Sequence, residues 1–283
     1  MRPLFLLASV LVYAACASAP AAPPPVVSAP PPPAITPAPP VASAAPSSAT
    51  PTDPIAAVQA EADAWRAAHK LIDLHTHVEP TAEHLAQAVR VFDAAGVGVA
   101  VNLSGGLVTH ATGQPSEFEQ TKAAADRQYP GRFLEYMNLD YADWDKSDFA
   151  QRAVTQVEEG ARLGAAGFKE FKRLGLYLRD GKGRLIKVDD PKLDPMWHRL
   201  GELGMPVSIH VADPKAFWEP YDDHNERWVE LKDHPRWWFG DPKKFPPRMD
   251  LLAALEHVVA RHPETTFVCV HMGNNAEDLD WVA

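Results

Sequence analysis

The feature that most constrains the fold is a regular alternation of apolar strand-like segments with helix-like segments. The pattern predicts strands over 71–77, 97–106, 132–141, 165–172, 205–213 and 265–271. It predicts helices over 81–96, 116–131, 146–164, 193–204 and 248–264, with a last helix starting near 275. Strands separated by helices pair in parallel, and runs such as VGVAV are apolar on both faces, as buried parallel strands are. The pattern fits either a doubly wound open sheet or a (β/α)8 barrel.

The first 54 residues differ in composition from the rest. No charged residue lies between Pro3 and Thr52, and 15 of the 28 prolines lie in residues 1–54. Residues 1–16 are typical of a signal peptide, with Arg2 at the start, a short apolar run and small residues before Cys16. The segment YAAC resembles the lipobox of bacterial lipoproteins, so lipidation of Cys16 is expected. The alternatives are ordinary cleavage within ACASA and an uncleaved anchor.

Residues 17–54 form a Pro/Ala-rich segment without helical or strand periodicity. Such a composition predicts a disordered, extended linker that holds a domain away from its anchor. The barrel domain is then expected over 55–283. Together these features predict an exported protein, either a membrane-anchored lipoprotein in the periplasm or at the cell surface, or a secreted protein.

Charge and cysteine content limit the partners and the disulfides that this chain is expected to have. The chain of 283 residues has a formal net charge of −10 and no basic stripe, which argues against binding nucleic acid. A membrane contact is expected only through a lipid on Cys16, and homo-oligomers remain open. Cys269 alone remains in the folded part, so no internal disulfide is expected, and its apolar surroundings predict a packing role.

Four of the twelve histidines lie at the carboxyl ends of predicted strands. His75 and His77 end the first strand, His210 ends the fifth and His271 ends the sixth. Alternation places His75, His77 and Asp73 on one face. In parallel α/β folds the carboxyl ends of the strands meet at the active site, and converging imidazoles can share a metal ion. The other eight are interpreted as surface or capping residues: His69, His84, His110, His198, His224, His234, His257 and His262.

The motifs IDLHTH, IHVAD and FVCVHMGNNAEDL together resemble the amidohydrolase superfamily, specifically its amidohydrolase-related branch. The resemblance covers residues 70–283 and implies a (β/α)8 barrel, or TIM barrel, which chooses between the two architectures. It implies that His75, His77 and His210 bind one divalent ion, with zinc expected. His271 would ligate a second metal or transfer protons beside the first.

Two departures from the family pattern stand out. The family carries a final Asp on strand eight, and no residue here matches it because the chain ends after the sixth predicted strand. An incomplete barrel with about six of its eight strands, two open edges and an unfilled core is therefore expected. Two-metal members use a lysine or glutamate on strand four, where Lys169 and Glu170 are candidates for a second metal or for substrate binding.

Three functions follow from these observations. The leading one is a metal-dependent hydrolase that attacks an amide, ester or lactone with activated water. The alternatives are a metal-dependent nonoxidative decarboxylase of the same branch and a catalytically inactive truncated barrel. Residues 213–249 are rich in Trp, Phe and basic residues, and predict either a lid over a small-molecule substrate or a self-packed subdomain.

Overall fold

The computed structural model describes residues 54–283, which belong to one compact unit, Pro51–Ala283. The expected signal peptide, Cys16 and almost all of the linker lie outside the described residues. In the described part of the chain, no helix combines the length and the apolarity needed to cross a membrane. Helix α1 begins at Pro54 and runs to Ala67, where no helix was predicted.

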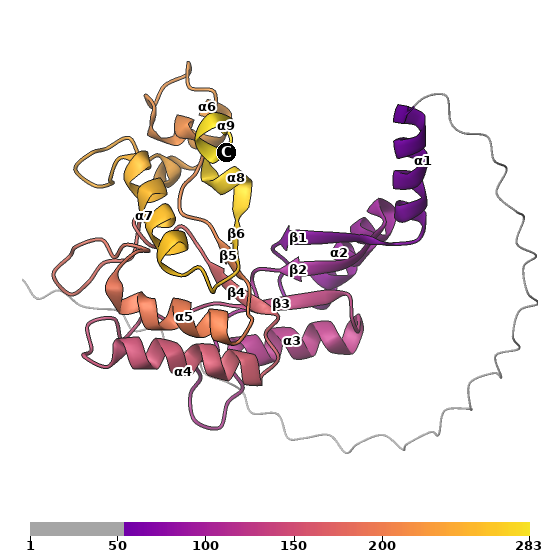
Figure 1. Ribbon diagram of the computed structural model, residues 1–283, viewed down its shortest axis with the longest axis horizontal. Coiled ribbons are helices and arrows are strands. Elements are labelled where there is room, and N and C mark those ends of the chain that lie inside the picture. Colours follow the sequence, from indigo (N-terminus) through magenta and orange to yellow (C-terminus); the bar gives the residue numbers. More distant parts are fainter. Residues whose placement is uncertain (1–53) are drawn as a thin grey trace, which may run out of the picture. The chain divides into compact units, whose positions relative to one another are not determined.

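Six parallel strands form one sheet in the order β1-β2-β3-β4-β5-β6. Sequential order with parallel pairing is the arrangement of a (β/α)8 barrel, and the sheet curls into a half-barrel (Figure 1). The strands are β1 (Leu71–Thr76), β2 (Val97–Asn102), β3 (Phe133–Met137), β4 (Gly167–Glu170), β5 (Val207–Ile209) and β6 (Phe267–Cys269). The predicted incomplete barrel is confirmed for the described residues.

Each predicted helix forms, with boundaries within a few residues of those expected. The helices between strands are α2 (Ala82–Ala95), α3 (Glu117–Gln128), α4 (Phe149–Arg162), α5 (Asp194–Glu202) and α7 (Arg248–Arg261). Thr81 caps α2 and Gly96 ends it in a left-handed conformation, while Ser116 and Glu119 form a capping box on α3. The helix near 275 reduces to α9 (Leu279–Val282), which follows the short, kinked α8 (Val270–Asn274). Residues 213–249 add α6 (Trp228–Leu231).

The main core lies between the strands and the helices α4, α5 and α7. Phe168 of β4 packs edge-on against Trp197 of α5, and both side chains are fully buried. Burying such side chains contributes about 1.5–3 kcal/mol each. At Gly160 of α4 an added Cβ would lie 2.1 Å from the sulfur of Met137, so glycine lets this helix approach β3 closely.

Apolar side chains are exposed on the edge strand β1 and on the inner strand β3. On β1, Ile72 and Leu74 are 61% and 58% exposed, and Leu134 of β3 is 42% exposed. Cys269 at the end of β6 is also exposed, so the predicted packing role for this thiol is wrong. The open edges and incomplete core that were expected are therefore present among the described residues.

A β-bulge in β1 changes which side chains face the site. Asp73 is paired with Ala100, whereas Thr76 is paired with Asn102, so β1 has one more residue than β2 in this interval. Paired residues in a sheet point to the same side, so Asp73 and Thr76 share a face although they are three residues apart. His75 therefore points away from Asp73, and the expectation that Asp73 lies beneath the histidines is wrong.

Candidate metal centre

The four strand-end histidines come together at the carboxyl end of the sheet. The ring centroids of His75 and His77 are 5.3 Å apart, and that of His271 lies 4.8 Å from His75. The ring of His210 is 4.9 Å from that of His271. Residues separated by almost 200 positions in the sequence thus share one cluster, because β1, β5 and β6 curl toward one another.

The spacing of His75 and His77 suits a shared metal ion. Their Nε2 atoms are 3.3 Å apart. With metal–nitrogen bonds of about 2.0–2.1 Å and a tetrahedral angle, two ligand nitrogens lie about 3.3 Å apart. Ser104 lies 2.8 Å from Nδ1 of His77, and its hydroxyl can accept the Nδ1 proton and leave Nε2 free for a metal.

His210 is oriented by its own loop. Its Nε2 lies 3.0 Å from the carbonyl oxygen of Ala212 and 3.4 Å from a carboxylate oxygen of Asp213. Both oxygens only accept hydrogen bonds, so Nε2 donates and Nδ1 keeps the lone pair that a metal needs. Asp213 also pairs with Lys172, so this carboxylate is held from two sides.

The cluster is looser than a closed three-ligand site. Among residues 54–283, the one group of three or more donors that lie within 4.8 Å of one another is Asp222, Asp223 and His224. These three residues are exposed on a loop, whereas the strand-end histidines fit a metal by donor type and by the His75–His77 spacing. A third histidine ligand therefore requires a side-chain rotation of His210 or His271.

Burial and positive charge favour the neutral form of His75, His77 and His271. The pKa of His75 is lowered to about 4, first by burial and then by the charges of Lys169 and the neighbouring histidines. Burial is also the largest cause of the lowered pKa of His77 and of His271. Neutral imidazole is the form that binds metals, so the electrostatics agree with the donor geometry.

Strand β4 places Lys169 and Glu170 on opposite faces. Phe168 packs on α5, so alternation turns Lys169 toward the histidines. Its buried Nζ has no hydrogen-bond partner in the described part of the chain. Burial lowers the pKa of Lys169 to about 8, against the opposing effect of Glu170. Glu170 points the other way, accepts a 2.5 Å hydrogen bond from Tyr141, and has a pKa raised to about 7 by burial. Of the two candidates, the structure brings Lys169 to the site.

The chain after β6 has an unusual backbone. His271, Met272, Gly273 and Asn274 have φ values of 54°, 55°, 64° and 62°. Left-handed conformations cost about 1–2 kcal/mol for each residue with a Cβ, and they persist when surrounding contacts impose them. Here they turn the chain sharply after Val270 and carry His271 toward His75 and His210.

Residues 213–249 are largely self-packed. Phe217 and Phe239 are buried in the main core, and the indole N–H groups of Trp218 and Trp238 donate to the carbonyl oxygens of Pro246 and Glu219. The segment nevertheless contributes Arg227 to a cavity of about 380 Å³ that His210 and His271 also line. The self-packed arrangement is therefore present, while a lid over a small-molecule substrate stays a prediction.

Sequence reasoning missed three polar residues around the site. These are Ser104 beside His77, Asp213 beside His210, and Ser208, whose buried hydroxyl has no hydrogen-bond partner. Short polar residues are common near strand ends, so the pattern did not single them out. Of the eight histidines interpreted as surface or capping residues, His262 is buried and is the C-cap residue of α7, in agreement with the capping alternative.

Fold and site define the class of protein: a parallel α/β chain of the TIM-barrel type with histidines gathered at the carboxyl ends of its strands. A family model described as Amidohydrolase matches residues 72–283, which is most of the chain, and the chain belongs to this amidohydrolase family. No curated protein matches the chain.

Several solved structures are similar at low identity. An amidohydrolase from Mycobacterium avium subsp. paratuberculosis K-10 is 18% identical, with 69% of this chain and 52% of that chain covered and a TM-score of 0.39. The 5-carboxyvanillate decarboxylase of Novosphingobium aromaticivorans, crystallised with manganese, is 21% identical. The match covers 69% of this chain and 52% of that chain, with a TM-score of 0.42. The 2,6-dihydroxybenzoate decarboxylase of Rhizobium is 16% identical. The match covers 74% of this chain and 68% of that chain, with a TM-score of 0.43. This chain spans about half the length of the first two proteins.

Proposed function

We propose that the chain is a metal-dependent hydrolase in which His75, His77 and His210 hold one divalent ion. The observation that carries the proposal is the 3.3 Å separation of the His75 and His77 Nε2 atoms, with His271 and His210 completing the cluster. Membership of the amidohydrolase family supports it. A divalent ion held there supplies Lewis acidity that polarises a carbonyl and makes water nucleophilic near neutral pH.

His271 is the proton-transfer residue in this proposal. Its lowered pKa leaves the ring neutral at pH 7, so it can accept a proton from the attacking water. The same ring can return the proton to the leaving group of an amide, ester or lactone. Its ring contacts with His75 and His210, two of the proposed ligands, support this role.

A second candidate is a nonoxidative decarboxylase, which Lys169 favours. A buried ammonium group without a hydrogen-bond partner among the described residues suits a substrate that brings its own carboxylate. In that reaction His271 would take up a proton from solvent and pass it to the carbon that loses CO2. A bound carboxylate can serve either reaction, so Lys169 informs on the substrate more than on the bond that is broken.

Metal analysis and product analysis test the proposal. The purified chain should bind about one zinc ion, and the variants His75→Ala and His77→Ala should not. Incubation with lactones, amides and aromatic acids, with detection of released CO2, then separates hydrolysis from decarboxylation. If a folded preparation bound no divalent metal, both the hydrolase and the decarboxylase proposals would be refuted, and an inactive barrel would be favoured.

Export is proposed from the sequence of residues 1–54 alone. Mass spectrometry of the mature chain from its host should find a lipid on Cys16, with the linker following it. An unmodified mature start within ACASA would instead indicate secretion, and an intact Met1 would contradict cleavage altogether.

A further inference from the structure

Two buried side chains link the chain segments that carry His210 and His271. Asn274 accepts a hydrogen bond of 2.8 Å from the backbone N–H of Val211 and donates one of 3.0 Å to the carbonyl of Val270. Val211 directly follows His210, and Val270 directly precedes His271. The Asn274 side chain therefore joins the two strands at the point where their backbone pairing has ended.

Arg248, at the start of α7, holds the same two segments from outside the site. Its Nε donates to the carbonyl oxygen of Asp213 at 3.0 Å, and its Nη2 donates to the carbonyl oxygen of Asn274 at 2.5 Å. Nη1 donates to Asn275 at 2.8 Å, and Nη2 also pairs with Glu277 at 3.1 Å. One guanidinium thus contacts both the loop after β5 and the loop after β6.

We call Arg248 and Asn274, with these hydrogen bonds, the clamp. The clamp contacts the segment with the left-handed backbone, residues 271–274. Asn is one of the few residues that tolerates positive φ, and Asn274 has a φ of 62°. Arg248 and Asn274 are 8% and 4% exposed, so water does not compete for these hydrogen bonds. Neither side chain is among the histidines and Lys169 that form the cluster, which separates their role from ligand binding.

We propose that Arg248 and Asn274 are positioning residues that set the distance and orientation of His210 and His271. Asn274 fixes the backbone on both sides of the pair, and Arg248 fixes the loop of Asp213, which in turn contacts His210. The inference rests on the proposed metal site, because its effect is transmitted to the metal ligands.

The test uses the folded chain loaded with zinc alone or cobalt alone. Asn274→Gly keeps the left-handed backbone accessible and removes both side-chain hydrogen bonds. Arg248→Lys keeps the charge and removes the fork of donors. Outer contacts of this kind change metal affinity about 10–100-fold, so both variants should weaken zinc binding by that factor in chelator competition. The visible absorption bands of the cobalt-loaded protein should also shift.

Matched controls separate positioning from general destabilisation. Arg132 donates to the carbonyl oxygens of Gly98 and Val97 and to Asp93 at the amino end of the strands, so Arg132→Lys removes a comparable network far from the site. Asn225→Gly removes a buried asparagine that bonds two carbonyl oxygens in the segment after β5. Both controls should keep the wild-type zinc affinity and cobalt spectrum, even if they lower the melting temperature as much.

The outcomes distinguish the two proposals. If the wild-type chain binds zinc and both clamp variants, folded by circular dichroism, match its affinity and spectrum, the clamp is refuted and the metal site stands. Equal losses in the clamp variants and their controls would also refute it. If the folded wild-type chain binds neither metal, the metal site fails and the clamp fails with it.

Discussion

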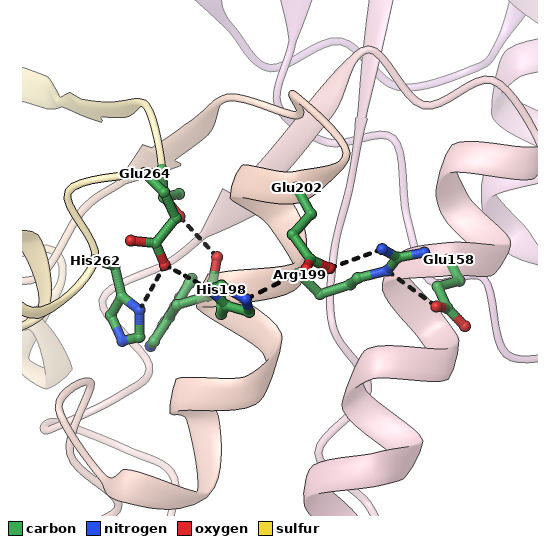
Figure 2. A network of polar contacts seen from close by, with 8 residues as sticks. Glu158, His198, Arg199, Glu202, His262 and Glu264 are labelled. Carbon is green, nitrogen blue, oxygen red and sulfur yellow. Dashed lines mark hydrogen bonds and ion pairs between the residues drawn. The ribbon is translucent and has the colours of Figure 1, made fainter.

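Two groups of histidines in this chain have opposite surroundings. At the carboxyl end of the sheet, no carboxylate within residues 54–283 forms an ion pair with His75 or His77, and their pKa values are lowered. In the network of Figure 2, His198 lies 2.8 Å from Glu264, which is the largest cause of its raised pKa. His262 contacts Asp194 at 3.1 Å and Glu264 at 3.4 Å.

The difference shows what each group can do. A histidine paired with carboxylates joins helix ends and loops through charge-assisted contacts, as those of Figure 2 join α5 to the loop before β6. A histidine that is neutral, partly buried and next to other imidazoles keeps a lone pair for a metal. The position on a strand end or on a helix separates the two groups more reliably than the residue type.

Removal of one histidine from each group should give the largest contrast. Zinc sites with four ligands bind with about 10–16 kcal/mol, so one ligand contributes about 2.5–4 kcal/mol, or about 70- to 900-fold in affinity. We expect His77→Ala to lose zinc affinity by about that factor and His198→Ala to keep it. Isothermal titration calorimetry of the two folded variants measures this, and equal affinities would remove the distinction between the groups.

Buried carboxylates extend the comparison. Glu135 of β3 is 3% exposed, and within residues 54–283 neither of its oxygens has a hydrogen-bond partner. Its pKa is raised to about 7, mainly by burial, with nearby Asn102 opposing the shift. The folded chain therefore holds a proton that the unfolded chain releases near pH 4.5, so stability falls as the pH rises from about 4.5 to about 7.

The substitution Glu135→Gln should remove that loss. The variant should be more stable than the wild type by up to about 3 kcal/mol at pH 8 and equal to it near pH 4. Urea unfolding at both pH values measures the difference. Glu264→Gln should instead lower the free energy of unfolding above pH 4.5. His198 lowers the pKa of Glu264, so the charged carboxylate stabilises the folded chain there. If both variants raised, or both lowered, the free energy of unfolding at pH 8, this explanation would be contradicted.

Within the network, the buried histidine should contribute more than the exposed one. His262 is 6% exposed, so His262→Ala leaves a cavity and removes contacts to two carboxylates. We expect a loss of about 2 kcal/mol in the free energy of unfolding. His198→Ala is the control and should cost less, because its side chain is 58% exposed. Chemical denaturation at pH 6 measures both, and a larger loss for His198→Ala would reverse the expected order.

Most of the fold followed from the sequence, because apolar periodicity and caps such as Thr81 are local signals. Strand ends were predicted too far along the chain, since the residues that follow each ladder are also apolar or small. The phase change at Asp73 was not predictable, because a bulge depends on the register of the neighbouring strand. For the same reason the face of Lys169 became clear only from the packing of its neighbour Phe168 on α5.

The candidate site was predictable in its histidines and not in its supporting residues. Strand-end position marked His75, His77, His210 and His271, and the structure gathers them, while their roles stay predictions. The contacts of Asn274 and Arg248 join loops that are far apart in sequence. The burial of His262 likewise depends on tertiary contacts with Asp194, which no local pattern reveals.

Among the substitutions in the network of Figure 2, Arg199→Ala is expected to have the smallest effect on the melting temperature. Arg199 contacts Glu158 of α4 at 2.9 Å and Glu202 at 2.7 Å (Figure 2). The two glutamate side chains are exposed and that of Arg199 is partly exposed. Exposed ion pairs are screened by salt and contribute little, so Arg199→Ala should lower the melting temperature less than His262→Ala does. The remaining difference should disappear in 1 M NaCl, whereas the effect of His262→Ala should persist. Scanning calorimetry at low and high salt measures both, and a salt-independent loss for Arg199→Ala would show that this arginine stabilises the helix pair by packing rather than by charge.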